Sequence, residues 1–476
     1  MSASSTTRRI PSPNSGRRCS PLVALVAVLF TAVVLLVSGA RTGAQEQHQS
    51  YTVTDLGTLP GDSYSTATAI NGSGQVVGYS YIDEGYQHAF LYENGQMKDL
   101  GTLPGGSWSE AYDINNSGQV VGVSGTSSGQ HAFLYENGQM KDLGTLPGGA
   151  TLSTANAING SGQVVGYSWT SSGNAHAFLY EDGQMKDLGT LPGGSYSYAE
   201  DINGSGQVVG WANTSSGYLV QHAFLYENGQ MKDLGTLPGG DSSRAYSIND
   251  SGQVVGVSGT SSGQHAFLYE NGQMVDLGTL PASHSYPYSR AYGINDSGQV
   301  VGDSEPSHAF LYESGQMVDL NDRIPSDSGV LVDARDINNE GQIVGNGVHN
   351  GQRRAFLLTP SYPFQGFYQP VDNPPTINVA KARVGIPVKF SLGGDQGLDI
   401  FAADYPKSQR IACDSTAPID RIEQTVTTGA SNISYDVATG QYIYVWKTTK
   451  AWKGTCQRFI MKLDDGTVHR ANFKFK

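Results

Sequence analysis

The strongest constraint on the fold is a set of three short motifs that recurs seven times between residues 51 and 360. The first motif, IN-x-SGQVVG with variants, has its isoleucine at Ile70, Ile114, Ile158, Ile202, Ile248, Ile294 and Ile337. The second motif, HAFLYE, begins at His88, His131, His176, His222, His265 and His308, and its variant RAFLL begins at Arg354. The third motif, DLGTL, begins at Asp55, Asp99, Asp142, Asp187, Asp233 and Asp276, and its variant DLNDR begins at Asp319. A fixed period of this kind predicts a repeat architecture in which each unit packs on its neighbours.

Each unit predicts four β-strands, around A-x-x-IN, QVVGYS, HAFLYE and QMKDLG. The last two are joined in several units by Asn-Gly, which is the strongest short signal for a hairpin because both residues adopt positive φ. Successive HAF motifs are 43 to 46 residues apart. Four strands in about 40–50 residues match one blade of a propeller, and the lack of helical periodicity excludes an α-solenoid.

The order of the motifs predicts that the repeats close on themselves. The first, YTVTDLGTL, is a fourth strand without its unit, and the last, RAFLLTP, is a third strand without its partner. An open solenoid would leave both edges unpaired, which proteins avoid. We therefore expect a seven-bladed β-propeller over residues 51–360, closed by the N-terminal strand of Asp55 against the strand of Arg354.

The recurring histidines are predicted to be structural, because six side chains spaced around a ring cannot share one metal. Each histidine, the phenylalanine two residues later and the aspartate of the next DLG have the same strand parity, so they share a face. We expect His88 to donate a hydrogen bond to Asp99 or to a neighbouring unit, with the same arrangement in the other units. We expect Arg354 to donate to Asp55 in the seventh unit.

Candidate ligand-binding residues are sought where the units differ. Aromatic side chains vary around the turn after LPGG and around the loop between the second and third strands. They form a candidate binding rim of Tyr64, Tyr79, Tyr81, Trp108, Trp169, Tyr196, Trp211 and Tyr288. Exposed aromatic clusters bind sugars or proteins, and the alternative is that each ring only covers its own LPGG turn. Inner-strand residues that also vary are expected at the mouth of the channel: Tyr112, Glu200, Tyr246, Tyr292 and Arg335.

Signals for metals and catalysis are weak. The strings DINNSG, DINGSG and DINNEG, which begin at Asp113, Asp201 and Asp336, resemble the opening of a calcium loop, but no bidentate acid follows at the required distance. Turns with Asx hydrogen bonds explain them as well, so we expect no cofactor, with calcium as the alternative. The N-x-S strings of the repeats are interpreted as turns first and glycan acceptors second. No G-x-S-x-G elbow or HExxH motif occurs, and we expect no catalytic residues.

The N-terminal 44 residues predict an export signal. They contain five arginines and no acid, followed by an apolar run over residues 21–37. Small residues occupy positions 38–40 and 42–44, and cleavage is expected after Ala40 or Ala44. The alternative is an uncleaved anchor, since 17 apolar residues are near the lower limit for spanning a bilayer. A secreted or cell-surface location follows, with a membrane partner only if the segment is uncleaved.

Charge and cysteines divide the remaining chain. Residues 45–360 carry 10 Lys and Arg against 32 Asp and Glu, whereas residues 361–476 carry 14 against 10. The acidic part would repel phosphate backbones, so nucleic acid is a poor candidate partner. After a proline-rich linker over residues 361–375, residues 376–476 predict a small immunoglobulin-like β-sandwich. Cys413 and Cys456 are expected to form one disulfide.

Two resemblances cover nearly all of the mature chain. The HAF, INxSGQVVG and DLGTLPGG motifs resemble the HAF repeats of bacterial extracellular proteins. The string GIPVKFSLGG, with Pro387, Lys389 and Phe390, and the string YVWKTTKAWKGTC resemble the PxKF domain at the C-termini of exported bacterial proteins. The resemblances imply export and a modular layout and name no ligand. We predict a secreted binding module for an extracellular glycan or protein, with an extracellular propeller hydrolase or lyase acting on polysaccharide as the alternative.

Overall fold

The structure is a computed structural model that describes residues 49–82, 86–149, 151–215, 220–281, 287–414, 417–422, 425 and 432–476. The predicted export signal over residues 1–44 lies outside these residues. The described chain is all-β apart from two short 3-10 helices, η1 (Leu320–Arg323) and η2 (Lys450–Trp452). None of its helices has the length and apolar character needed to cross a membrane.

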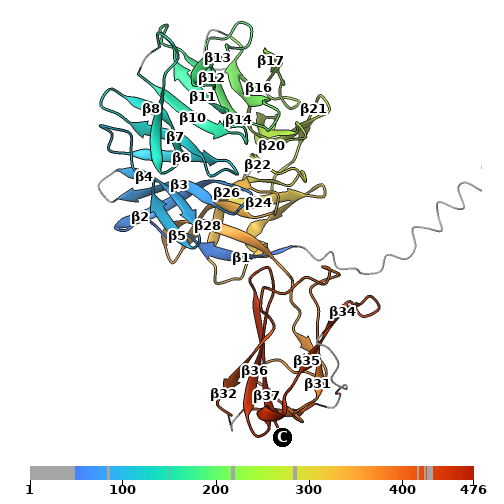
Figure 1. The fold of residues 1–476 in the computed structure, drawn as a ribbon. Helices are drawn as coiled ribbons and strands as arrows, with labels where there is room; N and C mark the ends of the chain where they lie inside the picture. Colours follow the sequence, from blue (N-terminus) through green and yellow to red (C-terminus); the bar gives the residue numbers. More distant parts are fainter. Residues whose placement is uncertain are drawn as a thin grey trace, which may run out of the picture. The chain divides into compact units, whose positions relative to one another are not determined.

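Residues 50–361 form seven four-stranded antiparallel sheets, numbered here as units 1 to 7 (Figure 1). Unit 1 contains β2 (Asp62–Ile70), β3 (Val76–Ile82), β4 (Gln87–Glu93) and β5 (Gln96–Asp99). Unit 2 contains β6 (Ser109–Ile114), β7 (Val120–Gly125), β8 (Gln130–Glu136) and β9 (Gln139–Gly144). Unit 3 contains β10 (Ser153–Ile158), β11 (Val164–Trp169), β12 (Ala175–Glu181) and β13 (Gln184–Asp187). Together with the four units that follow, they give a propeller-like fold.

The same strand order continues through the later units. Unit 4 contains β14 (Ser197–Ile202), β15 (Val208–Asn213), β16 (Gln221–Glu227) and β17 (Gln230–Asp233). Unit 5 contains β18 (Ser243–Ile248), β19 (Val254–Gly259), β20 (Gln264–Glu270) and β21 (Gln273–Asp276). Unit 6 contains β22 (Ser289–Ile294), β23 (Val300–Ser304), β24 (His308–Glu313) and β25 (Gln316–Asp319). Unit 7 contains β26 (Val330–Ile337), β27 (Ile343–His349), β28 (Gln352–Ser361) and β1 (Ser50–Asp55).

A two-residue turn joins the third and fourth strands in units 1 to 6. Its first residue has φ between 50° and 52° and its glycine has φ between 77° and 80°, as at Asn94-Gly95 and Ser314-Gly315. Positive φ at both positions is what a type I′ hairpin needs. The Asn-Gly signal in the sequence therefore located the hairpins correctly, and Asp182 and Ser314 take the place of asparagine in two units.

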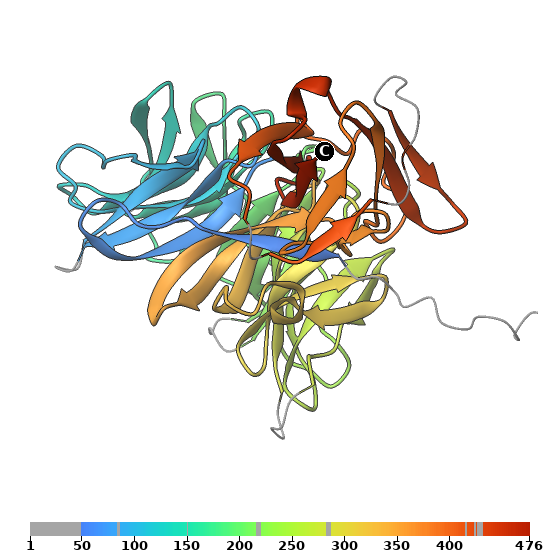
Figure 2. The same ribbon diagram turned by 90° about the horizontal axis from the view of Figure 1, so that it is seen from below.

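The first strand of the described chain completes the last unit. β1 pairs with β28 in antiparallel register, with Asp55 opposite Phe356 and Ser50 opposite Ser361. The pairing joins residues more than 300 positions apart in sequence, and both views show β1 beside the strand of unit 7 (Figures 1 and 2). The loose fourth and third strands of the sequence are thus partners of each other.

One buried asparagine per unit connects each unit to the next. In unit 3 the Asn159 Nδ2 donates to Gln163 Oε1 at 2.7 Å and to the carbonyl oxygen of Asn203 at 3.2 Å, while its Oδ1 accepts two backbone N–H groups. The same bond to the following unit runs from Asn71, Asn115, Asn203, Asn249 and Asn295. The seventh asparagine, Asn338, donates to the carbonyl oxygen of the first, Asn71, at 3.1 Å. The succession of hydrogen bonds therefore returns to its start.

A buried serine at the start of the inner strand makes a second connection in units 1 to 6. Ser109 accepts a hydrogen bond from the Ala89 amide of unit 1 and donates to the Gly101 carbonyl of the connecting turn, at 2.9 and 2.6 Å. Unit 7 has valine at this position, and Asn321 of the DLNDR variant bonds both backbone groups of Leu331 instead. In unit 7 the Asn321 side chain thus replaces the serine in linking the turn to the inner strand.

The glycine of each VVG string allows the first two strands of a unit to approach closely. A Cβ added at Gly122 would lie 2.0 Å from the carbonyl oxygen of Glu110, and the equivalent distances in the other six units are 1.8 to 2.1 Å. Any side chain here would collide with backbone. The glycine therefore recurs because of the close strand contact next to the bulge that begins after Ala111.

The C-terminal residues form two further sheets. One contains β29 (Phe367–Tyr368), β31 (Gly385–Phe390), β35 (Gln441–Lys447) and β34 (Ile433–Asp436). The other contains β32 (Lys407–Ile411), β36 (Cys456–Lys462), β37 (Val468–Phe475), β30 (Ile377–Ala380) and β33 (Ile419–Arg421). Both contribute to one buried aromatic core that includes Phe390, Trp446 and Phe473. The predicted disulfide between Cys413 and Cys456 is present.

We predict that Asn159→Ala lowers the free energy of unfolding of the repeat region by about 1–3 kcal/mol, because it leaves buried backbone groups without partners. Ser161→Ala, two residues away with an exposed side chain, is the matched control and should change stability by less than about 0.5 kcal/mol. Denaturant unfolding of both variants measures the difference. Equal stability of the two would contradict the role of the asparagine.

Candidate functional site

Three positions per unit differ in chemistry although the backbone around them repeats. The first follows the inner-strand serine and holds Thr66, Glu110, Thr154, Tyr198, Arg244, Arg290 and Asp333. The second is the extra residue of the inner-strand bulge and holds Thr68, Tyr112, Asn156, Glu200, Tyr246, Tyr292 and Arg335. The third lies opposite the first on the second strand and holds Tyr79, Val123, Tyr167, Trp211, Val257, Asp303 and Asn346. Directly opposite residues share a face, so we call these three positions the variable face.

The first cavity on the variable face lies over units 5 and 6 and is called here the arginine cavity. It has a volume of about 290 Å³ and is lined mainly by polar groups, among them Arg244, Tyr246, Arg290 and Tyr292. Tyr246 and Tyr292 contact each other with ring centroids 5.6 Å apart. The cavity therefore combines two cations, two phenol groups and two aromatic faces.

The second cavity lies over units 7 and 1 and is called here the tyrosine cavity. It has a volume of about 280 Å³, and Tyr64, Tyr79, Tyr81 and Arg335 lie in its wall. The rings of Tyr64 and Tyr81 stack with centroids 4.1 Å apart, and Tyr79 meets Tyr81 edge-on at 5.5 Å. Burial raises the pKa of Tyr81 to about 12, so its hydroxyl is neutral and can both donate and accept.

Two carboxyl groups of the variable face have unusual surroundings. Glu200 accepts hydrogen bonds from Trp211 Nε1 at 2.9 Å and Asn156 Nδ2 at 3.3 Å, and burial nevertheless raises its pKa to about 7. Burial also raises the pKa of Asp303, which lies 3.9 Å from the Arg290 guanidinium. Its Oδ1 atom is buried without a hydrogen-bond partner among the described residues.

The predicted rim residues are distributed over several places. Tyr64, Tyr79 and Tyr81 come together in the tyrosine cavity, and Trp211 stacks on Tyr198 with centroids 4.1 Å apart beside the arginine cavity. The Trp108 ring lies against Gly125, at the end of β7 in its own unit. Of the remaining members, Tyr288 contacts Ser307 and Arg290 through its side chain. The backbone carbonyl of Trp169 lies next to Gly149, and the backbone N–H of Tyr196 donates to Asn213 Oδ1.

Each recurring histidine contacts the aspartate of its own hairpin. In units 1 to 6 the histidine Nδ1 lies 2.6 to 2.9 Å from an aspartate Oδ2, as in the pair His88 and Asp99. The other carboxylate oxygen of Asp99 accepts the Gly101 amide at 2.7 Å. These contacts agree with the geometry expected from strand parity, and a purely structural role of the histidines stays a prediction.

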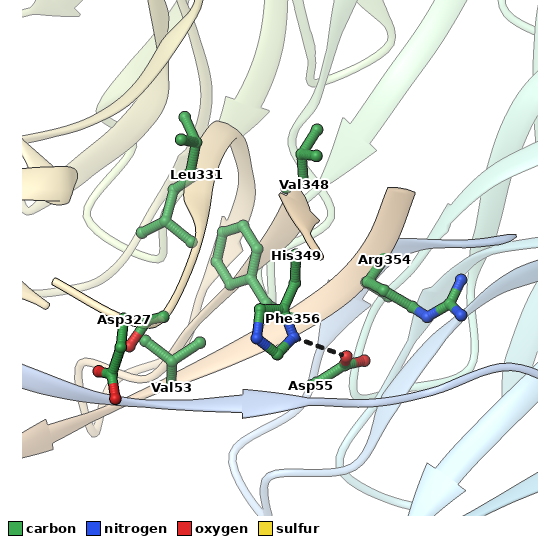
Figure 3. Close-up of a pocket in the computed structure, with 12 residues that line it drawn as sticks. Val53, Asp55, Asp327, Leu331, Val348, His349, Arg354 and Phe356 are labelled. Atoms are coloured by element: carbon green, nitrogen blue, oxygen red, sulfur yellow. Dashed lines mark hydrogen bonds and ion pairs between the residues drawn. The ribbon is translucent and has the colours of Figure 1, made fainter. Parts of the chain in front are cut away.

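Unit 7 differs from the expected arrangement. Arg354 donates to the carbonyl oxygen of Ser63 at 2.6 Å and to Gln352, and Asp55 instead lies 3.4 Å from His349 Nδ1. The guanidinium points away from Asp55 because the arginine side chain is longer than the histidine it replaces and reaches the neighbouring unit (Figure 3). The predicted hydrogen bond from Arg354 to Asp55 was therefore wrong, because the side chain that contacts Asp55 is His349.

The same unit contains a third cavity, of about 230 Å³, next to β1. Figure 3 shows the apolar side chains of Val53, Leu331 and Phe356 along it, with Asp327 near one end. The His349 and Asp55 pair lies at the other end. This third cavity lies outside the variable face, and fewer polar side chains line it than line the arginine and tyrosine cavities.

The aspartates of the calcium-like strings serve another purpose. Asp113, Asp201 and Asp336 each accept the backbone N–H of an isoleucine in a different unit, at 2.8 to 2.9 Å, and also the N–H of the isoleucine that follows them. These three carboxylates therefore connect the inner strands of different units. No group of three or more His, Cys, Asp or Glu that could hold a metal ion occurs among the described residues.

The asparagines of the six N-x-S strings, namely Asn71, Asn115, Asn159, Asn203, Asn249 and Asn295, are only 3 to 5% exposed. Their side-chain amides are occupied by the bonds that connect the units. A glycan on any of them would remove these bonds. The interpretation as turns therefore accounts for the strings.

Sequence reasoning missed part of the variable face. It named Glu200, Tyr246, Tyr292 and Arg335, but it did not single out Arg244 and Arg290 as ligand-binding candidates. Both follow the inner-strand serine, one position before the constant alanine. Comparing the units column by column at that position, rather than looking for aromatic residues, would have found them.

Comparisons with known proteins found one matching family model and solved structures of low sequence identity. A family model described as "Protein of unknown function (DUF3466)" matches residues 40–146 and 145–237. The search of curated proteins found no match. Among solved structures, TolB from Acinetobacter baumannii is similar at 10% identity with a TM-score of 0.34, over 54% of this chain and 69% of that chain. A gluconolactonase from Xanthomonas campestris is similar at 11% identity with a TM-score of 0.29, over 51% of this chain and 82% of that chain.

The three inner aspartates predict how stability depends on pH. Burial raises the pKa of Asp113 to about 7 and of Asp336 to about 6, and it also raises the pKa of Asp201. Because these folded-state values exceed those of the unfolded chain, protonation favours the fold. Their contribution is fully present below about pH 4 and is lost as the pH rises through about 6 to 7.

We therefore expect the difference in melting temperature between pH 5 and pH 8 to be smaller in the triple variant D113N/D201N/D336N than in the wild type. Asp322→Asn, at an exposed aspartate, is the control and should keep the wild-type difference. Thermal unfolding at the two pH values measures both. A triple variant with the full wild-type difference would show that these groups do not carry it.

Proposed function

We propose that residues 51–360 form a closed seven-bladed β-propeller in a secreted binding module, and that a saccharide binds at its variable face. The units then serve as blades, β1 seals the ring, and the arginine and tyrosine cavities are the ligand-binding regions. The ligand class is chosen because both cavities combine aromatic faces with hydrogen-bonding groups, which suits the hydroxyls and apolar faces of sugar rings.

Two features support the closed ring. The pairing of β1 with β28 gives unit 7 four strands like the others. The asparagine bond from Asn338 to Asn71 continues the succession that links every earlier unit to the next. A closed ring also removes the unpaired edges that an open array would expose.

The observation that carries the proposal is that side chains from two sectors of the variable face line two cavities. A repeated scaffold needs the same contacts in every unit, and residues freed from that requirement are available for a ligand. Tyr64 and Tyr81 stack in one cavity, and Arg244 and Arg290 face the other. In contrast, the recurring histidine of units 1 to 6 is hydrogen-bonded to the aspartate of its own hairpin.

Export is supported by the disulfide between Cys413 and Cys456, since such bonds persist in oxidising compartments. The apolar segment before residue 44 and the resemblance to exported HAF-repeat and PxKF proteins point in the same direction. In this proposal the C-terminal sandwich, with Pro387, Lys389 and Phe390 on β31, is a module separate from the propeller.

Glu200 favours one alternative, an extracellular enzyme that cleaves polysaccharide. A carboxyl with a pKa near 7 has the property of a general acid in glycoside cleavage. Its two hydrogen bonds to Trp211 and Asn156 also suit a fixed structural role. Incubation of the protein with bound saccharides separates the two, because an enzyme shortens them and a binding module leaves their length unchanged.

The proposal predicts that the purified protein binds saccharides on a glycan array and that Trp211→Ala weakens the signal by about tenfold or more. The reason is that Trp211 stacks on Tyr198 and lies under the Arg244 guanidinium. Trp169→Ala, in unit 3, which contributes no residue to either cavity, is the matched control and should bind normally. Absence of saccharide binding by the wild type would overturn the proposal.

A further inference from the structure

The basic residues of the acidic repeat region are unevenly placed. Residues 45–360 contain four lysines and six arginines. All four lysines, Lys98, Lys141, Lys186 and Lys232, are in the QMK strings of outer strands. Three arginines, Arg244, Arg290 and Arg335, instead lie on the inner strands of three consecutive units. Cationic charge is therefore concentrated on one sector of the variable face.

Arg244 and Arg290 are held in place by aromatic rings. The Arg244 guanidinium carbon lies 4.7 Å from the Trp211 ring centroid, and its Nε donates to Gln221 Oε1 at 2.8 Å. The Arg290 guanidinium carbon lies 5.1 Å from the Tyr288 centroid, and the group hydrogen-bonds to Tyr292. Stacking leaves the edge of a guanidinium, where its N–H donors lie, free to meet a ligand. Both arginines line the same cavity.

The acids around this cavity leave cationic charge available. Asp303 is 3.9 Å from Arg290, beyond hydrogen-bond distance, and burial raises its pKa. The charge of Arg244 lowers the pKa of Glu200, but burial has the larger effect and raises this pKa to about 7. Arg335 is the contrast, because its Nε lies 2.8 Å from Asp333 Oδ1 in a hydrogen-bonded ion pair. Arg244 and Arg290 are thus the cations of this sector that an anionic ligand group would meet.

We propose that the arginine cavity binds an acidic sugar residue, with its carboxylate between Arg244 and Arg290 and its ring against Tyr246 and Tyr292. A planar guanidinium matches a carboxylate through two parallel hydrogen bonds. The cavity volume of about 290 Å³ suits a ligand group of roughly one sugar residue. The inference rests on the proposed saccharide-binding function and specifies the chemistry of its ligand.

A saccharide with separated carboxylates fits the charge of the molecule better than a dense polyanion. Residues 45–360 carry a net charge of −22, from 10 basic and 32 acidic residues. That excess repels long runs of negative charge, whereas a single carboxylate in the cavity meets two local cations. Sulfated saccharides and inorganic phosphate share the anionic chemistry and are therefore separate arms of the test.

The test is an array of uronate-containing and neutral oligosaccharides, each uronate present in its native form and with its carboxyl reduced to an alcohol. We expect the bound saccharides to include native uronates and their carboxyl-reduced forms to bind at least about tenfold more weakly. If no saccharide binds, the proposed function fails and this inference fails with it. If native and reduced forms bind equally, only the inference fails. Stronger binding of heparin fragments or free phosphate than of any uronate would also overturn it.

Variants identify the site within the full protein. Arg244→Gln and Arg290→Gln should each weaken binding of the native uronate by about tenfold or more and leave the carboxyl-reduced form unchanged. Lys186→Gln removes the same charge from an exposed outer strand and should have no effect. Arg290→Lys, with a melting temperature matching the wild type, keeps the charge but not the planar fork and should give an intermediate loss. Equal binding by all of these variants would rule out the arginine cavity.

Discussion

In each repeat unit the side-chain amide of one buried asparagine forms hydrogen bonds both within its own turn and to another unit. Its oxygen accepts two N–H groups of its own turn in units 1 to 6 and one in unit 7, and its nitrogen donates to the carbonyl oxygen of the next asparagine, as from Asn159 to Asn203. Because the amide supplies both donors and an acceptor in a site with little water, losing it would leave buried backbone groups unpaired. This contact therefore links each unit to another one.

The proposed ring separates two kinds of residue. The asparagine and the glycine make the same contacts in all seven units, whereas the serine and the histidine and aspartate pair make theirs in units 1 to 6. The residue after the inner serine and the bulge residue next to it meet no such requirement, and they differ between units as much as Thr66 and Arg244 do. The bulge itself contributes, because the extra residue it inserts turns an additional side chain toward the neighbouring strands. Function is thus expected where the repeat is least regular.

Much of the scaffold could be predicted from the sequence, and the arrangement of the candidate site could not. Strand order, the Asn-Gly hairpins and the pairing partner of the first strand follow from the motif order and local turn chemistry. The disulfide followed from the two cysteines that lie after the predicted export signal. The donor to Asp55 was predicted as Arg354 and is His349, because the reach of a long side chain depends on its three-dimensional neighbours. The aromatic rim was predicted from residue type, but packing places Trp108 on its own Gly125 and brings Tyr64 to Tyr81.

The claim on which the other proposals depend is closure of the ring by β1. Thr52 and Thr359 lie directly opposite each other in the paired strands, at a separation that a disulfide can span. The account predicts that the double variant T52C/T359C, oxidised after purification, forms this bond in nearly every molecule, as mass spectrometry of the cross-linked peptide would show. Two free thiols under the same conditions, in a protein that still unfolds cooperatively, would contradict it.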